Sequence, residues 1–241
     1  MSNRFVFIAC HFNMSSTIKR MIHSLAGQSY ENWKLVITDD VSTGEYEYMD
    51  AQNAVWSFLE HSYDIEFKYN TEKRWETLNV LNMIRSETKD DDIICRIDCD
   101  DWLCDLDALY MINQQYEMTG CDVLWSGHRW GFSDKNISGP LPDDANPYTY
   151  PWVTSHLKTF RKSLLNGVNE ENFKNQNGDY VRRCGDQAIY LPVLHKAKKR
   201  VFLPRALYHY SINDVPETYQ SDDAKFQKTE ADFIRARGFI E

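Results

Sequence analysis

Apolar runs and amphipathic segments alternate through the first half of the chain. Runs of strand length, each bounded by polar residues, lie at 4–10, 33–38, 65–69 and 93–97. In the segment after the first run, apolar residues recur at helical spacing at Ile18, Met21, Ile22 and Leu25. Ser15 or Ser16 would cap this helix and Gly27 would end it. The alternation predicts an α/β fold with a mostly parallel, Rossmann-like sheet and helices on both faces.

Three further helices are expected in this half of the chain. They cover residues 45–60, the segment that contains Leu78, Leu81 and Ile84, and residues 105–119. The last of them would carry its apolar face on Leu106, Leu109, Ile112 and Tyr116.

The pattern changes character after residue 122. We expect a strand and aromatic turn at 123–132, a long polar loop at 133–151, a strand at 156–160 and short helices or strands at 162–165, 201–203 and 206–210. A helix is expected at 184–196, kinked near Pro192, and an exposed helix at 221–237 that Gly238 ends. We interpret residues 1–241 as a single domain with a first half at 1–122, a second half at 123–215 and a C-terminal helix at 216–241.

Carboxylates are most crowded in the stretch IICRIDCDDWL, at Ile93–Leu103. A buried strand is followed there by Asp98, Asp100 and Asp101. Carboxylates this close repel one another unless a cation or hydrogen-bond donors hold them, and divalent cations favour carboxylate ligands. The residues alone leave two interpretations open, a metal and phosphate site or a polar turn in which Asp105 caps the next helix. A second acidic pair, Asp39-Asp40, ends the second strand, and strand ends at one edge of a sheet converge in space.

Composition narrows the possible classes of protein. The chain has 241 residues, 42% of them hydrophobic, and a net charge of −9, which argues against nonspecific binding of nucleic acid. Its six cysteines form no CxxC pair, so we expect reduced thiols, with a zinc site as the minor alternative. No apolar run has the length of a membrane span, and the N-terminus lacks the pattern of a secretory signal, so we expect a cytoplasmic protein.

Three motifs in order resemble the family-2-type glycosyltransferases of the GT-A fold. The first is VFIACHFNMSSTIKRMIHSLAGQSYENWKLVITDDVST, the second RIDCDDWL, and the third RRCGDQAIY at residues 182–190. The resemblance covers roughly residues 4–210. It implies a single GT-A-like domain whose first half binds a nucleotide and whose second half, a small acceptor-side subregion, carries the catalytic base. The chain departs from the family pattern at Cys10-His11-Phe12 and at Val41, where glycine is common.

Site residues follow from the resemblance position by position. It implies Asp186 as the general base; a nucleotide site of Cys10, Asp40, Arg74, Asn82, Asp98 and Asp100; a metal site of Asp100, Asp101 and His209; and acceptor-side positions at Ser155 and His156. From the residues alone, the preferred interpretations are a helix N-cap for Asp186 and a satisfied buried histidine for His209.

The resulting expectation is a metal-dependent, inverting glycosyltransferase. It would use manganese or magnesium and transfer a sugar from a nucleotide-diphosphate donor, UDP-linked, to a hydroxyl of a saccharide or glycoconjugate. A phage-type enzyme acting on hydroxymethylated DNA bases is an alternative, which the basic run HKAKKR (195–200) favours and the acidic net charge opposes. A nucleotidyltransferase and a non-catalytic nucleotide-sugar-binding module also stay open, although the nucleotidyltransferase would need a glycine-rich loop that Cys10–Ser16 lacks.

Overall fold

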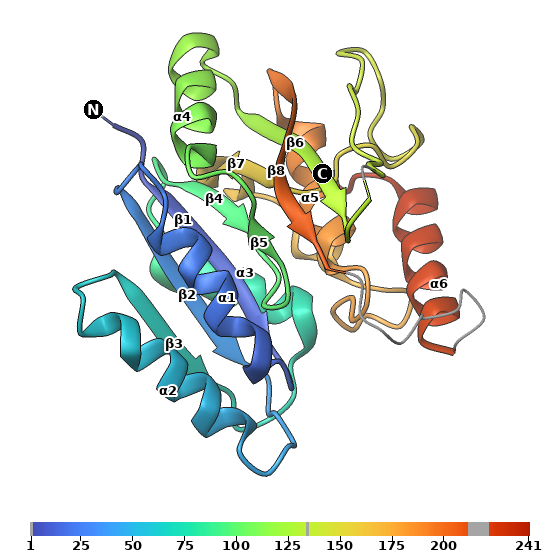
Figure 1. Ribbon diagram of the computed structural model, residues 1–241. Coiled ribbons are helices and arrows are strands. Elements are labelled where there is room, and N and C mark those ends of the chain that lie inside the picture. Colours follow the sequence, from blue (N-terminus) through green and yellow to red (C-terminus); the bar gives the residue numbers. More distant parts are fainter. Residues whose placement is uncertain (1, 134, 212–221) are drawn as a thin grey trace.

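The central strand β1 (Phe5–His11) is buried on both faces because its side chains alternate between two cores. Phe5, Phe7 and Ala9 enter one core, while Val6 and Ile8 enter the other. The computed structural model describes residues 2–133, 135–211 and 222–241 (Figure 1). In it, β2 (Trp33–Asp39) and β4 (Ile93–Arg96) flank β1 in parallel, and β3 (Ile65–Tyr69) pairs in parallel with β2.

The second half of the chain continues the same sheet. Its strands are β5 (Trp102–Leu103), β6 (Val123–Trp130), β7 (Lys158–Arg161) and β8 (Arg200–Tyr210). The order is β3-β2-β1-β4-β7-β6-β8-β5, in which β7 and β5 run antiparallel to their neighbours. The expected mostly parallel α/β sheet is confirmed, and strands from both halves of the chain lie side by side in it.

One strand replaces the two short strands expected between residues 201 and 210. Ser126 pairs with Leu203 and the next residue, Gly127, pairs with Ala206, so β8 bulges by two residues and continues. The bulge contains Pro204, which has no N–H for the ladder and is therefore tolerated there. The two-residue strand β5 was not expected at all.

Helices cover both faces of the sheet. On one face lie α1 (Ser15–Ala26), α2 (Glu47–Leu59) and α4 (Ala108–Thr119); on the other lie α3 (Trp75–Glu87) and α5 (Gly185–Lys196), which contains Pro192 (Figure 1). Two short 3₁₀ helices, Lys162–Leu165 and Glu170–Phe173, pack against α5. All five helices coincide with the expected segments to within a few residues.

Two local expectations about these helices were wrong. Neither Ser15 nor Ser16 caps α1, because the N-cap is Met14 and the Ser15 N–H donates instead to Glu47 Oε2 at 2.9 Å. Leu106 is 67% exposed, since α4 begins only at Ala108 and Leu106 lies in the preceding turn.

The last helix, α6 (Asp222–Arg237), is more than an exposed tail. Its Ile234 is fully buried against α5 residues, and its buried Glu230 accepts hydrogen bonds from the N–H groups of Arg182 and Arg183. The chain just before α5 is therefore fixed by α6. Gly238 follows the helix with φ 76°, as expected of a terminating glycine. Residues 216–221 of the expected C-terminal segment lie outside the described residues.

None of the helices that the structure describes is both long and apolar enough to cross a membrane.

Candidate active site

The acidic loop between β4 and β5 is held at the carboxyl end of the central strands. At its far end, Trp102 and Leu103 pair antiparallel with His209 and Tyr208 of β8, so the loop is tied to the sheet on both sides. The Tyr208 hydroxyl accepts from the Asp98 N–H at 3.1 Å and donates to Asp101 Oδ2 at 2.8 Å. One tyrosine of β8 therefore fixes the loop between its first and last aspartates.

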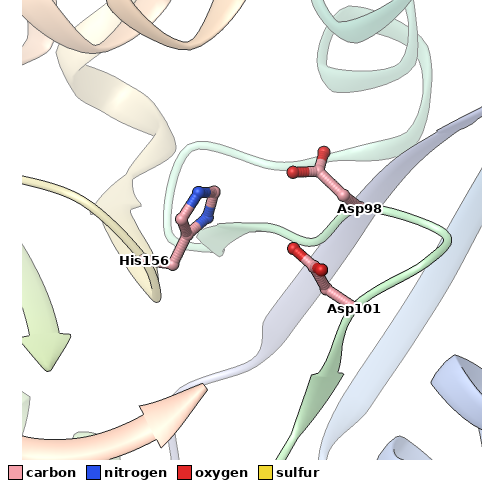
Figure 2. Close-up of side chains that lie close together, drawn as sticks. All are labelled: Asp98, Asp101 and His156. Carbon is pink, nitrogen blue, oxygen red and sulfur yellow. The ribbon is translucent and has the colours of Figure 1, made fainter. Parts of the chain in front are cut away.

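Asp98, Asp101 and His156 converge on one point. A ligand atom from each lies within 4.8 Å of the others, and Figure 2 shows the two aspartates of the loop facing the imidazole of a separate segment. Burial raises the pKa of Asp101 to about 9, and the charges of Asp98 and Asp100 add to the effect. Burial also lowers the pKa of His156 well below its usual value, so its ring is neutral and keeps a lone pair.

These three residues fit a divalent cation. Asp101 is only 1% exposed, and both of its oxygens accept hydrogen bonds, from the Tyr208 hydroxyl and from the Ser211 N–H at 2.7 Å. Those bonds suit an ionised carboxylate, which burial and two neighbouring negative charges oppose. A divalent cation among the three side chains would resolve the conflict, and two carboxylate ligands with one imidazole suit manganese better than calcium.

The structure does not bring two of the expected metal ligands into this group. Asp100 uses its carbonyl oxygen, which accepts from Ser211 Oγ at 2.6 Å and from Arg20 Nη2 at 3.1 Å. The His209 ring stacks on the Trp102 ring with centroids 3.7 Å apart. Because Tyr208 points to Asp101, the next residue on β8 points to the opposite face of the sheet. Among the described residues, the group of possible ligands contains His156, which we had expected on the acceptor side.

The side chain of Asp186 lines a cavity together with Asp98 and His156 of the possible ligand group. The cavity has a volume of about 160 Å³ and is lined by Glu76, Arg96, Asp98, His156, Lys158, Arg183, Asp186, Tyr210 and Gln227. Asp186 lies in the first turn of α5, whose N-cap is Cys184 without a side-chain hydrogen bond, so the N-cap interpretation of Asp186 is wrong. Its Oδ2 lies 3.5 Å from Lys158 Nζ.

Charged side chains from buried strands complete the cavity, and we had not expected them. Lys158 of β7 is 1% exposed. Arg96 of β4 is 7% exposed, and its Nη2 lies 2.6 Å from Glu76 Oε1 and 3.2 Å from Asp98 Oδ1. Burial raises the pKa of Glu76. The sequence signal that could have identified these residues is a cationic side chain within a buried strand, because a buried charge is stable only when it is paired.

Asp40 lies at the other side of the candidate site, where β2 ends. It is 4% exposed, and its oxygens accept from the N–H groups of Arg74 at 2.8 Å and Trp75 at 2.9 Å and from Asn70 Nδ2 at 2.9 Å. The carboxylate thus holds the beginning of α3. Arg74 and Asn82 line a separate polar groove of about 540 Å³ beside β3, together with Asn70.

The two departures from the family pattern have structural consequences near Asp40. His11 is fully buried, and its Nδ1 lies 2.7 Å from Asp39 Oδ2. Burial alone would raise the pKa of Asp39, but its hydrogen bonds with His11 and Ser42 outweigh that effect and lower it. Val41 has φ 62°, a left-handed conformation that a β-branched residue adopts at a cost.

The remaining expected residues lie around these features. Cys10 Sγ is 3.9 Å from the Glu76 carbonyl oxygen, and burial raises the pKa of its thiol. Ser155 is buried and does not line the cavity, although its neighbour His156 does. The basic run ends where β8 begins, and there Arg200 donates to the carbonyls of Asp143 and Ala145. The acidic loop pairs with β8 at His209 and Tyr208, near the last residues of the strand. The basic run therefore lies at the opposite end of the strands from the cavity.

A mixed sheet whose parallel strands end in carboxylates beside a small charged cavity fits the GT-A-type domain that the sequence motifs imply. The sequence profile of glycosyl transferase family 2 matches residues 6–185, and the chain therefore belongs to that family.

Solved structures of glycosyltransferases share the fold. Residues 1–349 of S. aureus TarS in complex with UDP-GlcNAc have 15% identity and a TM-score of 0.67, over 90% of this chain and 61% of that one. The mannosyltransferase PcManGT from Pyrobaculum calidifontis, in complex with GDP-Man and Mn²⁺, has 14% identity and a TM-score of 0.62, over 90% of this chain and 59% of that one. The chain thus spans about three fifths of the length of these proteins. No curated protein matches it by sequence.

Proposed function

We propose that the protein is a metal-dependent, inverting glycosyltransferase that moves a sugar from a nucleotide-diphosphate donor, UDP-linked, to an acceptor hydroxyl. The observation that carries the proposal is the shared cavity. Two members of the cation-ligand group, Asp98 and His156, line it together with the carboxylate of Asp186. Charge relief for the leaving diphosphate and a base for the acceptor are the two needs of this reaction, and here they lie side by side.

The metal would be held by Asp98, Asp101 and His156. When bound, a divalent cation there supplies positive charge to the leaving diphosphate. The protein contributes the positions of the ligands, because Tyr208 fixes Asp101 and Arg96 fixes Asp98. Manganese or magnesium is the proposed ion, and Mn²⁺ in the complex of the P. calidifontis mannosyltransferase supports it.

Asp186 would act as the general base. Its carboxylate accepts the acceptor's hydroxyl proton while the acceptor oxygen bonds to the anomeric carbon and the bond from that carbon to the diphosphate oxygen breaks. The Lys158 ammonium, 3.5 Å away, and the first turn of α5 both place positive charge beside the proposed base. A single displacement from the side opposite the diphosphate inverts the anomeric configuration.

The nucleotide would lie along the strand ends between Asp40 and the acidic loop. We propose that Asp40 contacts the base beside Cys10 and Arg74, that Asn82 lies further along the same groove, and that Asp98 and Asp100 approach the ribose and diphosphate. Support comes from the hydrogen bonds that join Asp40 to the groove residues Asn70 and Arg74. The UDP-GlcNAc in the TarS complex supports a UDP-linked donor.

For the acceptor we propose a saccharide or glycoconjugate. It would bind against residues of the second half of the chain, beside Ser155 and His156, and reach the cavity from the side of Asp186. A DNA acceptor receives less support, because the basic run that favoured it lies at the opposite end of the strands from the cavity. A cytoplasmic location stays a prediction from the sequence.

The test combines binding and transfer. Thermal unfolding is measured with a panel of nucleoside diphosphates and nucleotide sugars, with and without Mn²⁺, and the absence of any metal-dependent stabilisation would overturn the proposal. Asp186→Asn should keep that stabilisation and lose sugar transfer. Asp179→Asn is the matched control, because Asp179 pairs with Arg182 outside the cavity. If Asp186→Asn still transfers sugar at the wild-type rate, the base lies elsewhere.

A further inference from the structure

Strand β3 ends the sheet and presents half of its peptide groups away from it. It pairs with β2 alone among the strands that the structure describes. The Asp64 carbonyl accepts from the Leu35 N–H, and the Asn70 N–H donates to the Asp39 carbonyl, so the even-numbered peptide groups of this segment face β2. Peptide groups alternate along a strand, and those of Ile65, Phe67 and Tyr69 therefore face outward.

The sequence of β3, Ile65-Glu66-Phe67-Lys68-Tyr69, is complementary to a reversed copy of itself. If two copies pair antiparallel about Phe67, each Glu66 lies opposite the Lys68 of the other copy. The outward peptide groups make Phe67 a hydrogen-bonded pair with its counterpart. Ile65 and Tyr69 form the next pair through the bond from the Tyr69 N–H to the Ile65 carbonyl, because the Ile65 N–H already donates to the Tyr63 carbonyl at 3.0 Å. Glu66 and Lys68 then form the closely spaced pairs between them, where opposite charges stabilise a sheet.

These charged side chains are accessible for such pairing. The side chain of Glu66 is 37% exposed and that of Lys68 is 34% exposed, although within the chain they pair with each other at 3.2 Å and with Lys34 and Glu87. Charged residues on an edge strand disfavour pairing with an arbitrary strand. Here the alternation of sign admits one orientation and one register, which favours a second copy of this chain over an unrelated peptide.

An apolar flank of α2 lies beside this edge. One side of α2 faces α1 across a groove lined by Ser57, Phe58 and His61. Met49, Trp56 and Leu59 recur at helical spacing on the opposite side and are 56%, 53% and 41% exposed. Because Tyr48 of α2 packs against the rings of Phe67 and Tyr69, this flank and the outer edge of β3 belong to one surface.

We propose that the protein forms a symmetric dimer in which two β3 strands pair antiparallel about Phe67 and the apolar flanks of α2 pack across the two-fold axis. A pair of five-residue strands covers less than the roughly 800 Å² per partner of a standard interface, so the proposed dimer needs the α2 flank for the remaining area. The two sheets would form one continuous sheet, which removes an exposed edge from each copy. The inference does not depend on the proposed function.

The test measures mass in solution by light scattering after size exclusion, from micromolar to millimolar protein. Wild type should be a dimer, and a monomer throughout this range would overturn the proposal. Trp56→Glu should raise the dissociation constant at least tenfold. Ser57→Glu is the matched control, since it adds the same charge one residue away on the side of α1. Equal dissociation by both variants would overturn the assignment of the flank.

Charge reversal tests the register. Glu66→Lys and Lys68→Glu should each be monomeric alone, because like charges then face each other across the axis. An equal mixture of the two should form a heterodimer, since each lysine then meets a glutamate of the other chain. Thermal unfolding of each variant verifies that it is folded. Rescue in the mixture cannot come from ion pairs within one chain, and its absence, with a dimeric wild type, would overturn the proposed register.

Discussion

Asp101 allows the strictest test of the cation site, because a bound ion must displace its proton. Its pKa of about 9 means that without a cation the side chain is protonated near neutral pH, the fraction ionised falling about tenfold for each pH unit below 9. The neutral His156 has no proton to lose. We therefore expect the apparent affinity for Mn²⁺ or Mg²⁺ to rise about tenfold per pH unit between about pH 6 and about pH 8.

The metal-free protein should show the opposite trend in stability. A folded-state pKa raised from 3.8 to about 9 means that the folded protein holds a proton that the unfolded chain releases. The stability that Asp101 contributes is therefore fully present below its unfolded-state pKa of 3.8 and is lost as pH rises toward about 9. The free energy of unfolding falls there with a limiting slope of about 1.4 kcal/mol per pH unit. For a chain of this size, each kcal/mol of lost stability lowers Tm by about 2–4 °C.

Asp101→Asn tests both trends at once. The amide cannot ionise, so the variant should lose the metal-dependent rise in Tm and show a flatter dependence of Tm on pH. The assay is thermal unfolding at pH 6, 7 and 8 with and without Mn²⁺, supported by calorimetry in buffers of different ionisation enthalpy to count released protons. A wild-type metal affinity that does not change with pH, or a variant that keeps the metal response, would refute the reasoning.

Three further predictions concern a strained backbone position, a closely packed glycine and a buried lysine. Val41→Gly should raise stability by about 1 kcal/mol, because glycine adopts the left-handed conformation freely; a lower Tm would contradict this. Gly185→Ala should cost about 1–3 kcal/mol in urea unfolding, since its Cβ would lie 2.8 Å from Thr77 Oγ1. Gly139→Ala, whose Cβ meets nothing closer than 3.9 Å, should be nearly neutral, and equal losses would refute the explanation. Lys158→Met removes the ammonium beside the proposed base, and we expect about 1–2 kcal/mol of destabilisation with loss of transfer but retained nucleotide binding.

Elements with a local cause were predictable from the sequence. The bounds of β3 are those expected from its apolar run, and α1 follows from the spacing of Ile18, Met21, Ile22 and Leu25. Features that depend on a distant partner were not. Strand β5 exists only because Trp102 and Leu103 meet β8, more than a hundred residues later. The first N–H of α1, that of Ser15, donates to Glu47, from another helix.

The candidate site divides in the same way. That Asp40, Asp98 and Asp186 lie at one edge of the sheet follows from the ends of parallel strands and from the family motifs. The identity of the side chain that joins the carboxylates does not follow from the sequence. It depends on which face of β8, and which separate segment, lies toward the acidic loop. The structure places His156 beside Asp98 and Asp101, whereas His209, next to Tyr208 on β8, stacks on Trp102.

The position of Asp40 links two events that are usually considered separately. Its carboxylate holds the first N–H groups of α3, and α3 carries Glu76, which binds Arg96 in the wall of the cavity. A base that hydrogen-bonds Asp40 would therefore act on the helix that shapes the place of sugar transfer. Under the proposed function, the nucleoside would set the rate at which the sugar leaves as well as the strength with which the donor is held. A sugar diphosphate that lacks the base would then be a slow substrate even at saturation.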